Sequence, residues 1–216
     1  MKKGAIFDMD GLMFDTERLY QTIWNEIAES QGITLGEGFA KEIGGTSGDL
    51  LRSVIVKYYH TDDPDRIFAR VLSESRRRLQ ESVPLKPGLF ELLDYLRENH
   101  VTLAVASSSP IDLIRSNLRV AKCESYFDQV ISGHGLTRCK PFPDVFLNAA
   151  EELRLSPSDC YVLEDSINGV LAGLAAGCTT IMVPDYIEPS QEVMEKGANI
   201  CASLAEVRAR MERGEF

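Results

Sequence analysis

Two aspartates, Asp8 and Asp10, stand two residues apart near the start of the chain, in residues 4–11 with the sequence GAIFDMDG. The apolar run before Asp8 is typical of a buried strand, and Gly11 allows the chain to turn directly after the acids. In an open parallel sheet, ligands bind beyond the carboxyl ends of the strands. Two carboxylates at that place either repel each other or share a cation, and their oxygen atoms suit Mg²⁺. A pair of aspartates alone is equally typical of a solvated loop, so other residues must decide between these interpretations.

Further polar residues follow other apolar runs that also predict buried strands. In chain order they are Ser107 after residues 101–106, Lys140 after the weaker run 129–131, and Glu164 with Asp165 after residues 160–163. The carboxyl ends of parallel strands meet at one edge of a sheet, so all these side chains gather near Asp8 and Asp10. One such coincidence is weak evidence, but four together indicate a functional site.

The chemistry of this set of residues is that of phosphoryl transfer. Two acidic clusters can hold one Mg²⁺ between them, while a hydroxyl and an ammonium bind the phosphate oxygens that the metal leaves free. A free carboxylate can attack phosphorus to form an aspartyl-phosphate, and a neighbouring aspartate can act first as acid and then as base. Phosphoryl transfer mainly requires positioning and charge neutralisation, and this set supplies both.

The rest of the chain alternates between two kinds of pattern. Short apolar runs predict five strands, at residues 5–7, 101–106, 129–131, 160–163 and 180–183. Apolar residues at helical spacing predict helices among the later strands, at residues 89–96, 111–118, 145–153 and 170–174. Strands that alternate with short helices imply βαβ units with right-handed crossovers. We therefore expect an α/β fold with a Rossmann-like, parallel, five-stranded sheet.

The stretch between the first two predicted strands is too long for a single crossover connection. It carries three helical patterns; the second follows an expected cap at Ser47, and the third follows Asp63 and Pro64, a suitable N-cap and first helical residue. The arginines at 76–78 are expected to form a solvated face rather than an anion site. We expect an all-helical cap domain inserted after the first strand. The expected boundaries are residues 15–84 for the cap domain, and residues 1–14 plus 85–216 for the α/β core (catalytic) domain.

The composition of the chain limits which binding partners and which cellular compartment we expect. The 216 residues are 44% hydrophobic, which is enough for a folded core and argues against disorder. A net charge of −10 disfavours nucleic acid and anionic membranes as partners. Because there is no leader sequence and no apolar run of about 18 residues, we expect a cytoplasmic protein. We also expect it to be a monomer. The five cysteines are scattered and show no metal-binding spacing, so we expect buried free thiols.

The polar segments, taken in order, resemble the four motifs of the haloacid dehalogenase-like superfamily. These segments are Asp8-Met9-Asp10-Gly11, Ser107, Lys140-Pro141-Phe142-Pro143-Asp144 and Leu163-Glu164-Asp165-Ser166. They match the Mg²⁺-dependent phosphatase and phosphomutase branch of that superfamily. The helical insertion is similar to the cap of the β-phosphoglucomutase-like group. The resemblance covers the chain from residue 3 to about residue 184 and implies Mg²⁺ as the cofactor.

The resemblance also implies a role for each motif residue. By this resemblance, Asp8 is the nucleophile and a metal ligand, and Asp10 is the general acid and base and ligates the metal through its backbone carbonyl. Asp165 is the second carboxylate ligand of the metal, and Glu164 orients a water on it. Ser107 and Lys140 bind the transferring phosphate. Asp144 is expected to cap the helix that follows it. Asp15 and Thr16 are expected to form the hinge and to begin the first cap helix.

Three departures from the β-phosphoglucomutase pattern bear on the substrate. A glycine within residues 44–49 replaces the arginine that grips a second phosphate, Tyr20 replaces a histidine, and Pro110-Ile111 replaces a lysine-asparagine pair. We therefore expect a phosphatase that acts on a small phosphorylated metabolite of the sugar or nucleoside monophosphate type, through an aspartyl-phosphate intermediate. A phosphomutase is the alternative. A dehalogenase is disfavoured because those enzymes work without metal and lack the acid at Asp10, and a receiver-like signalling domain is a remote alternative because receivers have no inserted cap.

Overall fold

The computed structural model describes residues 1–36, 38–44, 46 and 48–216, which form two compact units. The larger unit is Met1–Asp15 with Pro84–Phe216, and it contains every strand in the described residues. The smaller unit is Thr16–Val83, in which the described elements are all helices. We call them the α/β unit and the helical unit. Each boundary lies one residue from the position expected from the sequence.

The α/β unit is built on a parallel sheet, as predicted. Its strands are β1 (Gly4–Phe7), β2 (Thr102–Ser107), β3 (Gln129–Ser132), β4 (Cys160–Glu164), β5 (Thr179–Met182) and β6 (Asn199–Ile200), in the order β3-β2-β1-β4-β5-β6. Every neighbouring pair is parallel. The prediction of five strands was wrong by one, because β6 was missed. This strand has only two residues, which is too short for an apolar run, and it pairs only with β5.

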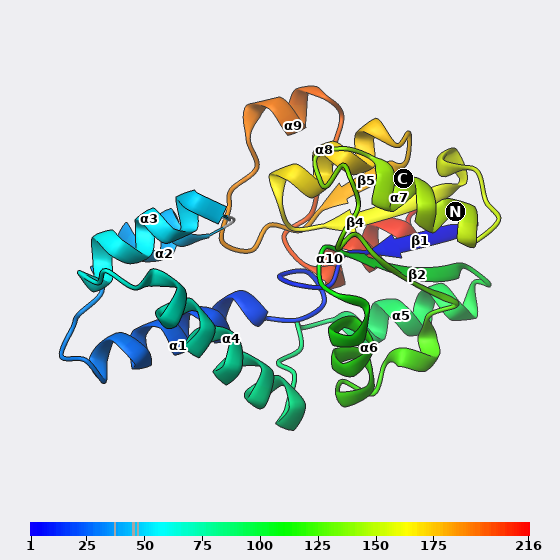
Figure 1. Ribbon diagram of the computed structural model, residues 1–216. Coiled ribbons are helices and arrows are strands. Elements are labelled where there is room, and N and C mark those ends of the chain that lie inside the picture. The colour runs from blue at the N-terminus through cyan, green and yellow to red at the C-terminus, as the bar shows by residue number, and fades with distance from the viewer. Residues whose placement is uncertain (37, 45, 47) are drawn as a thin grey trace. The chain divides into compact units, whose positions relative to one another are not determined.

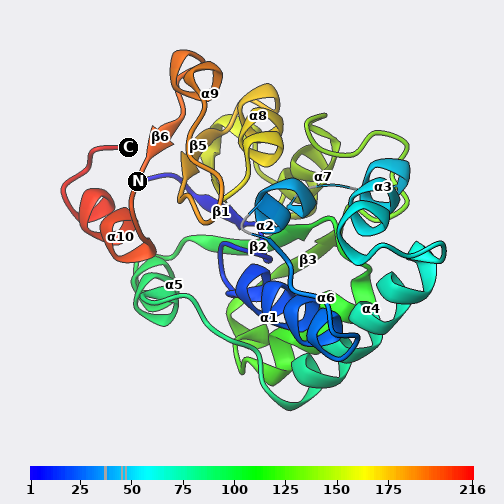
Figure 2. The same ribbon diagram turned by 90° about the vertical axis from the view of Figure 1, so that its left-hand side faces the viewer.

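Helices cover both faces of this sheet. They are α5 (Leu89–Glu98), α6 (Ile111–Val120), α7 (Asp144–Glu152), α8 (Ile167–Ala175), α9 (Gln191–Glu195) and α10 (Leu204–Glu212), with short 3₁₀ turns η1 (Glu124–Tyr126) and η2 (Pro157–Asp159). Figure 1 and Figure 2 both show α5 and α6 on one face and α7 and α8 on the other. All residues of β1 and β4 are buried, as expected for central strands covered on both faces.

The helical unit contains α1 (Thr16–Glu29), α2 (Gly38–Ile43), α3 (Gly48–Tyr59) and α4 (Pro64–Glu81). Its core surrounds Trp24, whose ring packs edge-on against Phe39 at 5.6 Å between centroids and whose backbone carbonyl accepts from the Tyr59 hydroxyl over 2.6 Å. Three helical patterns were predicted here, and α2 was missed. Its six residues place only two side chains in the core, Phe39 and Ile43, which is too few to establish a helical period.

The N-terminus of α4 is capped as predicted. The Asp63 carboxylate accepts from the Arg66 backbone N–H over 3.1 Å, and Pro64 is the first helical residue. The expected cap at Ser47 lies outside the described residues. No helix in the described part of the chain has both the length and the apolar character that crossing a membrane would need.

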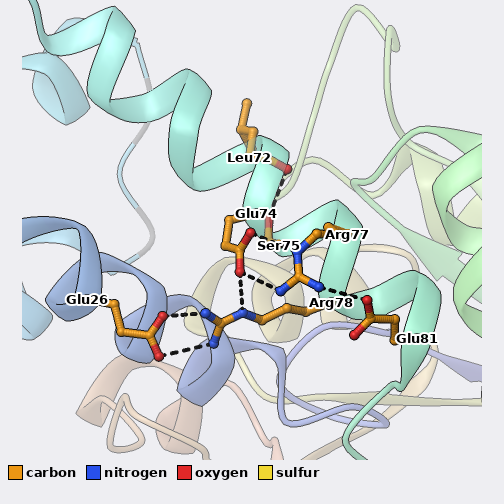
Figure 3. Close-up of polar contacts among 7 residues, drawn as sticks. All are labelled: Glu26, Leu72, Glu74, Ser75, Arg77, Arg78 and Glu81. Carbon is orange, nitrogen blue, oxygen red and sulfur yellow. Dashed lines mark hydrogen bonds and ion pairs between the residues drawn. The ribbon is translucent and has the colours of Figure 1, made fainter. Parts of the chain in front are cut away.

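Two of the three consecutive arginines of α4 lie in a cluster of acidic side chains (Figure 3). Arg78 bonds to Glu74 on its own helix over 2.8 Å and to Glu26 on α1. Arg77 bonds to Glu74 over 2.8 Å and to Glu81 over 2.7 Å. These five residues form what we call the surface ion cluster. Because carboxylates of the unit itself bind both guanidinium groups, the cluster fits the predicted solvated face.

Candidate active site

The residues predicted to act together come from strands that are neighbours in the sheet. Asp8 directly follows β1, Ser107 ends β2, and Glu164 ends β4 with Asp165 next to it. Since β1 lies between β2 and β4, their carboxyl ends are adjacent. The Asp8 N–H also continues the ladder by donating to the Leu163 carbonyl over 3.0 Å, which fixes the nucleophile candidate against the end of β4.

Lys140 joins this group from the loop between β3 and α7. Its ammonium donates to Asp8 Oδ1 over 2.5 Å and to Glu164 Oε1 over 2.6 Å, and it lies 3.4 Å from the Ala106 carbonyl. The Lys140 side chain is only 9% exposed, and its ammonium lies 4.9 Å from the centre of the Phe146 ring. Lys140 is therefore a buried bridge between the residues that follow β1 and end β4.

Three carboxylates surround this single ammonium. One oxygen from each of Asp8, Glu164 and Asp165 lies within 4.8 Å of the others. With Lys140 they form what we call the carboxylate cluster. Burial raises the pKa of the Asp8 carboxyl to about 7, although Lys140 acts in the opposite direction. Burial, followed by the charges of Glu164 and Asp8, also raises the pKa of Asp165 well above its usual value.

The same environment favours the charged form of Lys140, whereas it disfavours the charged forms of Asp8 and Asp165. Burial disfavours the charged form of Lys140, but the carboxylates of Asp8 and Glu164 outweigh burial and raise the pKa of the ammonium. The cluster therefore places one ammonium group among three crowded carboxyl groups. An additional cation would relieve that repulsion, and a set of hard carboxylate oxygens is the donor set that Mg²⁺ takes.

Two glycines leave the space that these carboxylates occupy. A Cβ on Gly11, which has a φ of +83°, would lie 2.2 Å from Asp165 Oδ2. A Cβ on Gly169, in the first turn of α8, would lie 1.7 Å from Glu164 Oε1. Contacts closer than about 3 Å to a side-chain oxygen exclude any larger residue at either place without a shift of the acid. From the sequence, Gly11 was predicted only as a turn residue, and no role was predicted for Gly169. The spacing of Gly169, three residues after Ser166, is the feature that could have indicated it.

Ser166 orients Glu164 from the other side. Its N–H and its hydroxyl donate to Glu164 Oε2 over 2.8 and 2.9 Å, while the same hydroxyl accepts from the Gly169 N–H and caps α8. One short segment therefore begins the helix and fixes the acid. Glu164 is 1% exposed, so these bonds and the Lys140 ammonium replace the water that it would otherwise bind.

Asp10 is held at the end of β2 by a residue that the sequence analysis missed. The Ser109 hydroxyl donates to Asp10 Oδ2 over 3.1 Å. Ser109 is itself fixed, because its N–H donates to the Ser107 hydroxyl over 3.1 Å and its carbonyl accepts from the Ser132 hydroxyl over 2.6 Å. Ser107 does not cap the next helix, because Pro110 directly precedes α6 and the Ser107 hydroxyl accepts from the Ser109 N–H.

Two expectations for the Lys140 loop were wrong. Asp144 does not cap α7, because Pro143 occupies the position before the helix and the Asp144 carboxylate turns to Arg138 instead, 3.0 Å from a guanidinium nitrogen. Cys139 is exposed, whereas the other four cysteines are buried as expected. Cys139 lies in the loop that carries Lys140 and not in a strand or helix, so no packed face covers its thiol.

Comparison with known proteins places this arrangement among enzymes. Residues 5–183 match the model of the family described as haloacid dehalogenase-like hydrolase. The chain is 35% identical over 212 residues to a probable pseudouridine-5'-phosphatase of Drosophila melanogaster, covering 94% of this chain and 90% of that protein. It is 32% identical over 186 residues to hexitol phosphatase B of Escherichia coli, covering 84% and 83%.

Its fold also matches a solved structure along nearly the full length. A putative beta-phosphoglucomutase from Thermotoga maritima superimposes with a TM-score of 0.83 and 29% identity, and the match covers 98% of this chain and 99% of that one. Sequence and fold comparisons therefore lead to the same group of proteins as the four motifs.

Proposed function

Since this chain belongs to the haloacid dehalogenase-like hydrolase family, in which it is a phosphoric monoester hydrolase, we propose that it is an Mg²⁺-dependent phosphatase of small phosphorylated metabolites that works through an aspartyl-phosphate. The observation that carries this proposal is the carboxylate cluster, in which Asp8, Glu164 and Asp165 oxygens lie within 4.8 Å of one another beside the buried Lys140. Asp8 is the acid at the centre of this group, since it directly follows β1, the strand between β2 and β4, and its carboxylate accepts from Lys140.

The first step transfers the phosphoryl group to the protein. An oxygen of the ionised Asp8 carboxylate attacks phosphorus, a P–O bond to Asp8 forms, and the P–O bond to the substrate's leaving oxygen breaks. The carboxylic acid of Asp10 gives its proton to that leaving oxygen, and the dephosphorylated alcohol departs. Ser107 and Lys140 bind the oxygens of the transferring group, with Lys140 neutralising part of their charge.

The second step returns Asp8 to its original form. Asp10, now a carboxylate, accepts a proton from a water molecule whose oxygen attacks phosphorus. The P–O bond to Asp8 breaks, inorganic phosphate forms, and Asp10 regains the acid form that the next cycle needs. The Ser109 hydroxyl, which binds Asp10 in this structure, keeps that side chain close to the end of β2 where Ser107 lies.

The residues of the cluster fit a divalent cation. Asp8 and Asp165 would bind it through their carboxylates and Asp10 through its backbone carbonyl, with Glu164 as a further acceptor. When bound, Mg²⁺ supplies charge neutralisation for the phosphate oxygens and for the crowded carboxylates. The clearance that Gly11 leaves for Asp165 and Gly169 leaves for Glu164 supports this fit, because a larger residue would displace the acids.

We propose a sugar phosphate or a nucleoside monophosphate as the substrate. The two relatives reported above are named for phosphatase activity on a nucleotide and on hexitols, and both cover more than four fifths of this chain. A phosphomutase is the second candidate, favoured by the fold match to the putative beta-phosphoglucomutase. Three departures argue against the mutase, because a mutase must hold a substrate with two phosphates: the glycine within residues 44–49, Tyr20, and Pro110-Ile111.

A substrate panel tests the proposal. The purified protein is given pseudouridine 5'-phosphate, hexitol phosphates, hexose 1-phosphates and an aryl phosphate, each with Mg²⁺ or with a chelator, and released phosphate is measured. We expect Mg²⁺-dependent release from at least one monophosphate without a bisphosphate activator. Isomerisation of a hexose 1-phosphate that requires a bisphosphate would instead establish the mutase. Absence of both activities, in protein whose melting temperature responds to Mg²⁺, would contradict the proposed chemistry.

A further inference from the structure

The two connections between the units lie side by side in the α/β unit. The Asp15 N–H donates to the Pro84 carbonyl over 2.8 Å, and the Lys86 N–H donates to the Met13 carbonyl over 2.9 Å. The chain therefore leaves this unit and returns to it through a short antiparallel pair of segments. We call this pair the connecting ribbon, residues 13–15 and 84–86.

The connecting ribbon is bonded directly to the turn that carries Asp10. The Phe14 N–H donates to the Met9 carbonyl over 3.1 Å, and the Phe14 carbonyl accepts from the Gly11 N–H over 2.9 Å. Phe14 is completely buried and also bridges Leu85 on the other side of the ribbon. A displacement of the ribbon therefore displaces the turn on either side of Asp10.

One side chain fastens this ribbon to a distant loop. The Lys86 ammonium donates to Asp185 Oδ1 over 2.6 Å and lies 3.3 Å from Asp15 Oδ1. Asp185 belongs to the loop after β5, at the same edge of the sheet as Asp8. Lys86 thus repeats the arrangement of Lys140, with one ammonium between two carboxylates from separate segments.

The three side chains are poorly exposed to water. Lys86 is 19% exposed, Asp185 11% and Asp15 23%. The second oxygen of Asp185 is buried and has no hydrogen-bond partner in the described residues. Asp185 therefore depends on the ammonium for compensation of its charge, and removal of one partner from such a pair leaves an uncompensated charge that pushes the segments apart.

We propose that Lys86 is a positioning residue for turnover, because its ammonium fastens the connecting ribbon to the loop after β5 and so restrains the movement of the helical unit that admits substrate and releases product. The inference rests on the proposed function, since it assumes that turnover requires such movement. Lys86 and Asp185 belong to none of the four motifs, and neither of them contacts the carboxylate cluster in the hydrogen bonds and ion pairs of the described residues. They act on substrate affinity only through the ribbon.

Hydrogen exchange tests the mechanical part of this proposal without any need for activity. In Lys86→Met, the backbone amides of Asp15 and Lys86, which close the ribbon, should exchange about tenfold faster than in the wild type because local opening becomes easier. Lys3→Met is the matched control. Lys3 forms an ion pair with Asp159 over 3.1 Å and precedes β1, so it lies at the opposite edge of the sheet. Unchanged exchange of the ribbon amides in Lys86→Met would overturn the proposal.

Steady-state kinetics test its functional part. A looser ribbon lowers the fraction of molecules in the arrangement that binds substrate, and the apparent affinity falls in proportion. Lys86→Met and Asp185→Asn should therefore raise KM several-fold and leave kcat within about twofold, since Asp8 and Lys140 are untouched. Lys86→Arg should restore KM, and Lys3→Met should leave both constants unchanged.

The double variant Lys86→Met with Asp185→Asn separates the pair from a general loss of stability. Because both changes remove the same interaction, their effects on KM should be less than additive. Additive effects, or a fall in kcat with KM unchanged, would overturn the proposal. If the wild type releases no phosphate from any substrate, the proposed function fails, while the exchange measurement still decides whether Lys86 fastens the ribbon.

Discussion

The carboxylate cluster of the α/β unit and the surface ion cluster of the helical unit both combine carboxylates with basic side chains. In the carboxylate cluster, the side chains of Lys140, Asp8 and Glu164 are at most 9% exposed. In the surface ion cluster, the exposed fractions of the side chains run from 26% for Arg78 to 67% for Glu81. Water therefore screens the second cluster and hardly reaches the first.

This difference in burial changes what the charges do. In the surface ion cluster, hydrogen bonds from Arg77 and then Arg78 lower the pKa of Glu74 to about 2, which favours its ionised form. In the carboxylate cluster, burial and like charges raise the pKa of Asp8 and of Asp165. In the exposed cluster every carboxylate has an arginine partner, whereas the buried cluster has three carboxyl groups around one ammonium, and an additional cation would relieve their repulsion.

The largest effect is expected from the acid at the centre of the carboxylate cluster. Asp8→Asn should abolish turnover while the fold is kept, because an amide has nearly the shape of a carboxylate but cannot attack phosphorus. Phosphate release and the circular dichroism spectrum are the measurements. Glu74→Gln, the same kind of change in the surface ion cluster, should retain full activity. More than a few per cent of activity in rigorously purified Asp8→Asn would remove the nucleophile assignment.

A smaller loss is expected at Asp10. Asp10→Asn should slow turnover by about 10²–10⁴, the usual contribution of a general acid and base. Phosphorylation by an aryl phosphate should be partly spared, since that leaving group needs less protonation than an alcohol. Rapid-mixing measurements of the first step with an alkyl and an aryl phosphate check this prediction. Equal losses for both substrates would show that Asp10 does not protonate the leaving group.

The need for an outside cation predicts a stabilising effect of Mg²⁺. A ligand that binds only the folded state adds about 2.7 kcal/mol at a hundredfold excess over its dissociation constant. For a chain of this size that corresponds to a rise in melting temperature of about 5–10 °C, if the α/β unit unfolds cooperatively. Thermal unfolding with and without Mg²⁺ measures the shift. Asp165→Ala should lose most of it, whereas Glu74→Gln should keep it; equal shifts in both variants would place the cation elsewhere.

The smallest effect is expected from the surface ion cluster itself. The pKa of folded Glu74 lies below its ordinary 4.5, at about 2, so Glu74 stabilises the fold above pH 4.5 and loses this contribution as the pH falls towards 2. Exposed ion pairs contribute only about 0.2–1 kcal/mol, and salt reduces that further. The difference in melting temperature between the wild type and Glu74→Gln should therefore be small at pH 6 and shrink between pH 4.5 and 2.5. A difference that grows on acidification would contradict the assignment.

The strand-end residues could be predicted from the sequence because each follows an apolar run that lies next to it in the chain. An apolar run such as the one before Asp8 or before Glu164 forms a buried strand, and parallel pairing then brings their ends together without further information. Contacts between loops could not be predicted from the sequence in this way. The bonds of Ser109 to Asp10 and of Lys86 to Asp185 each join residues 99 positions apart. No periodicity connects such positions, and only the folded loops bring them together.

The same reasoning explains the missed elements. The six residues of α2 place only Phe39 and Ile43 in the core, and two apolar positions are too few to establish a helical period. The strand β6 has two residues, of which Asn199 is polar, and it is recognisable only by its bonds to β5. The clearance at Gly169 also escaped notice, because a glycine inside a helical segment shows no sign of the Glu164 side chain that occupies its free space.

The connecting ribbon has a consequence for how this protein can change over evolutionary time. The chain leaves the α/β unit at Asp15 and returns at Pro84, and these two residues are hydrogen-bonded to each other. A segment whose ends already meet can be replaced by a longer or shorter one without moving any strand, since the entropy of closing such a loop grows only with the logarithm of its length. The helical unit is therefore an exchangeable module, and a new one can be inserted at the same two residues while the chemistry at the strand ends is inherited unchanged.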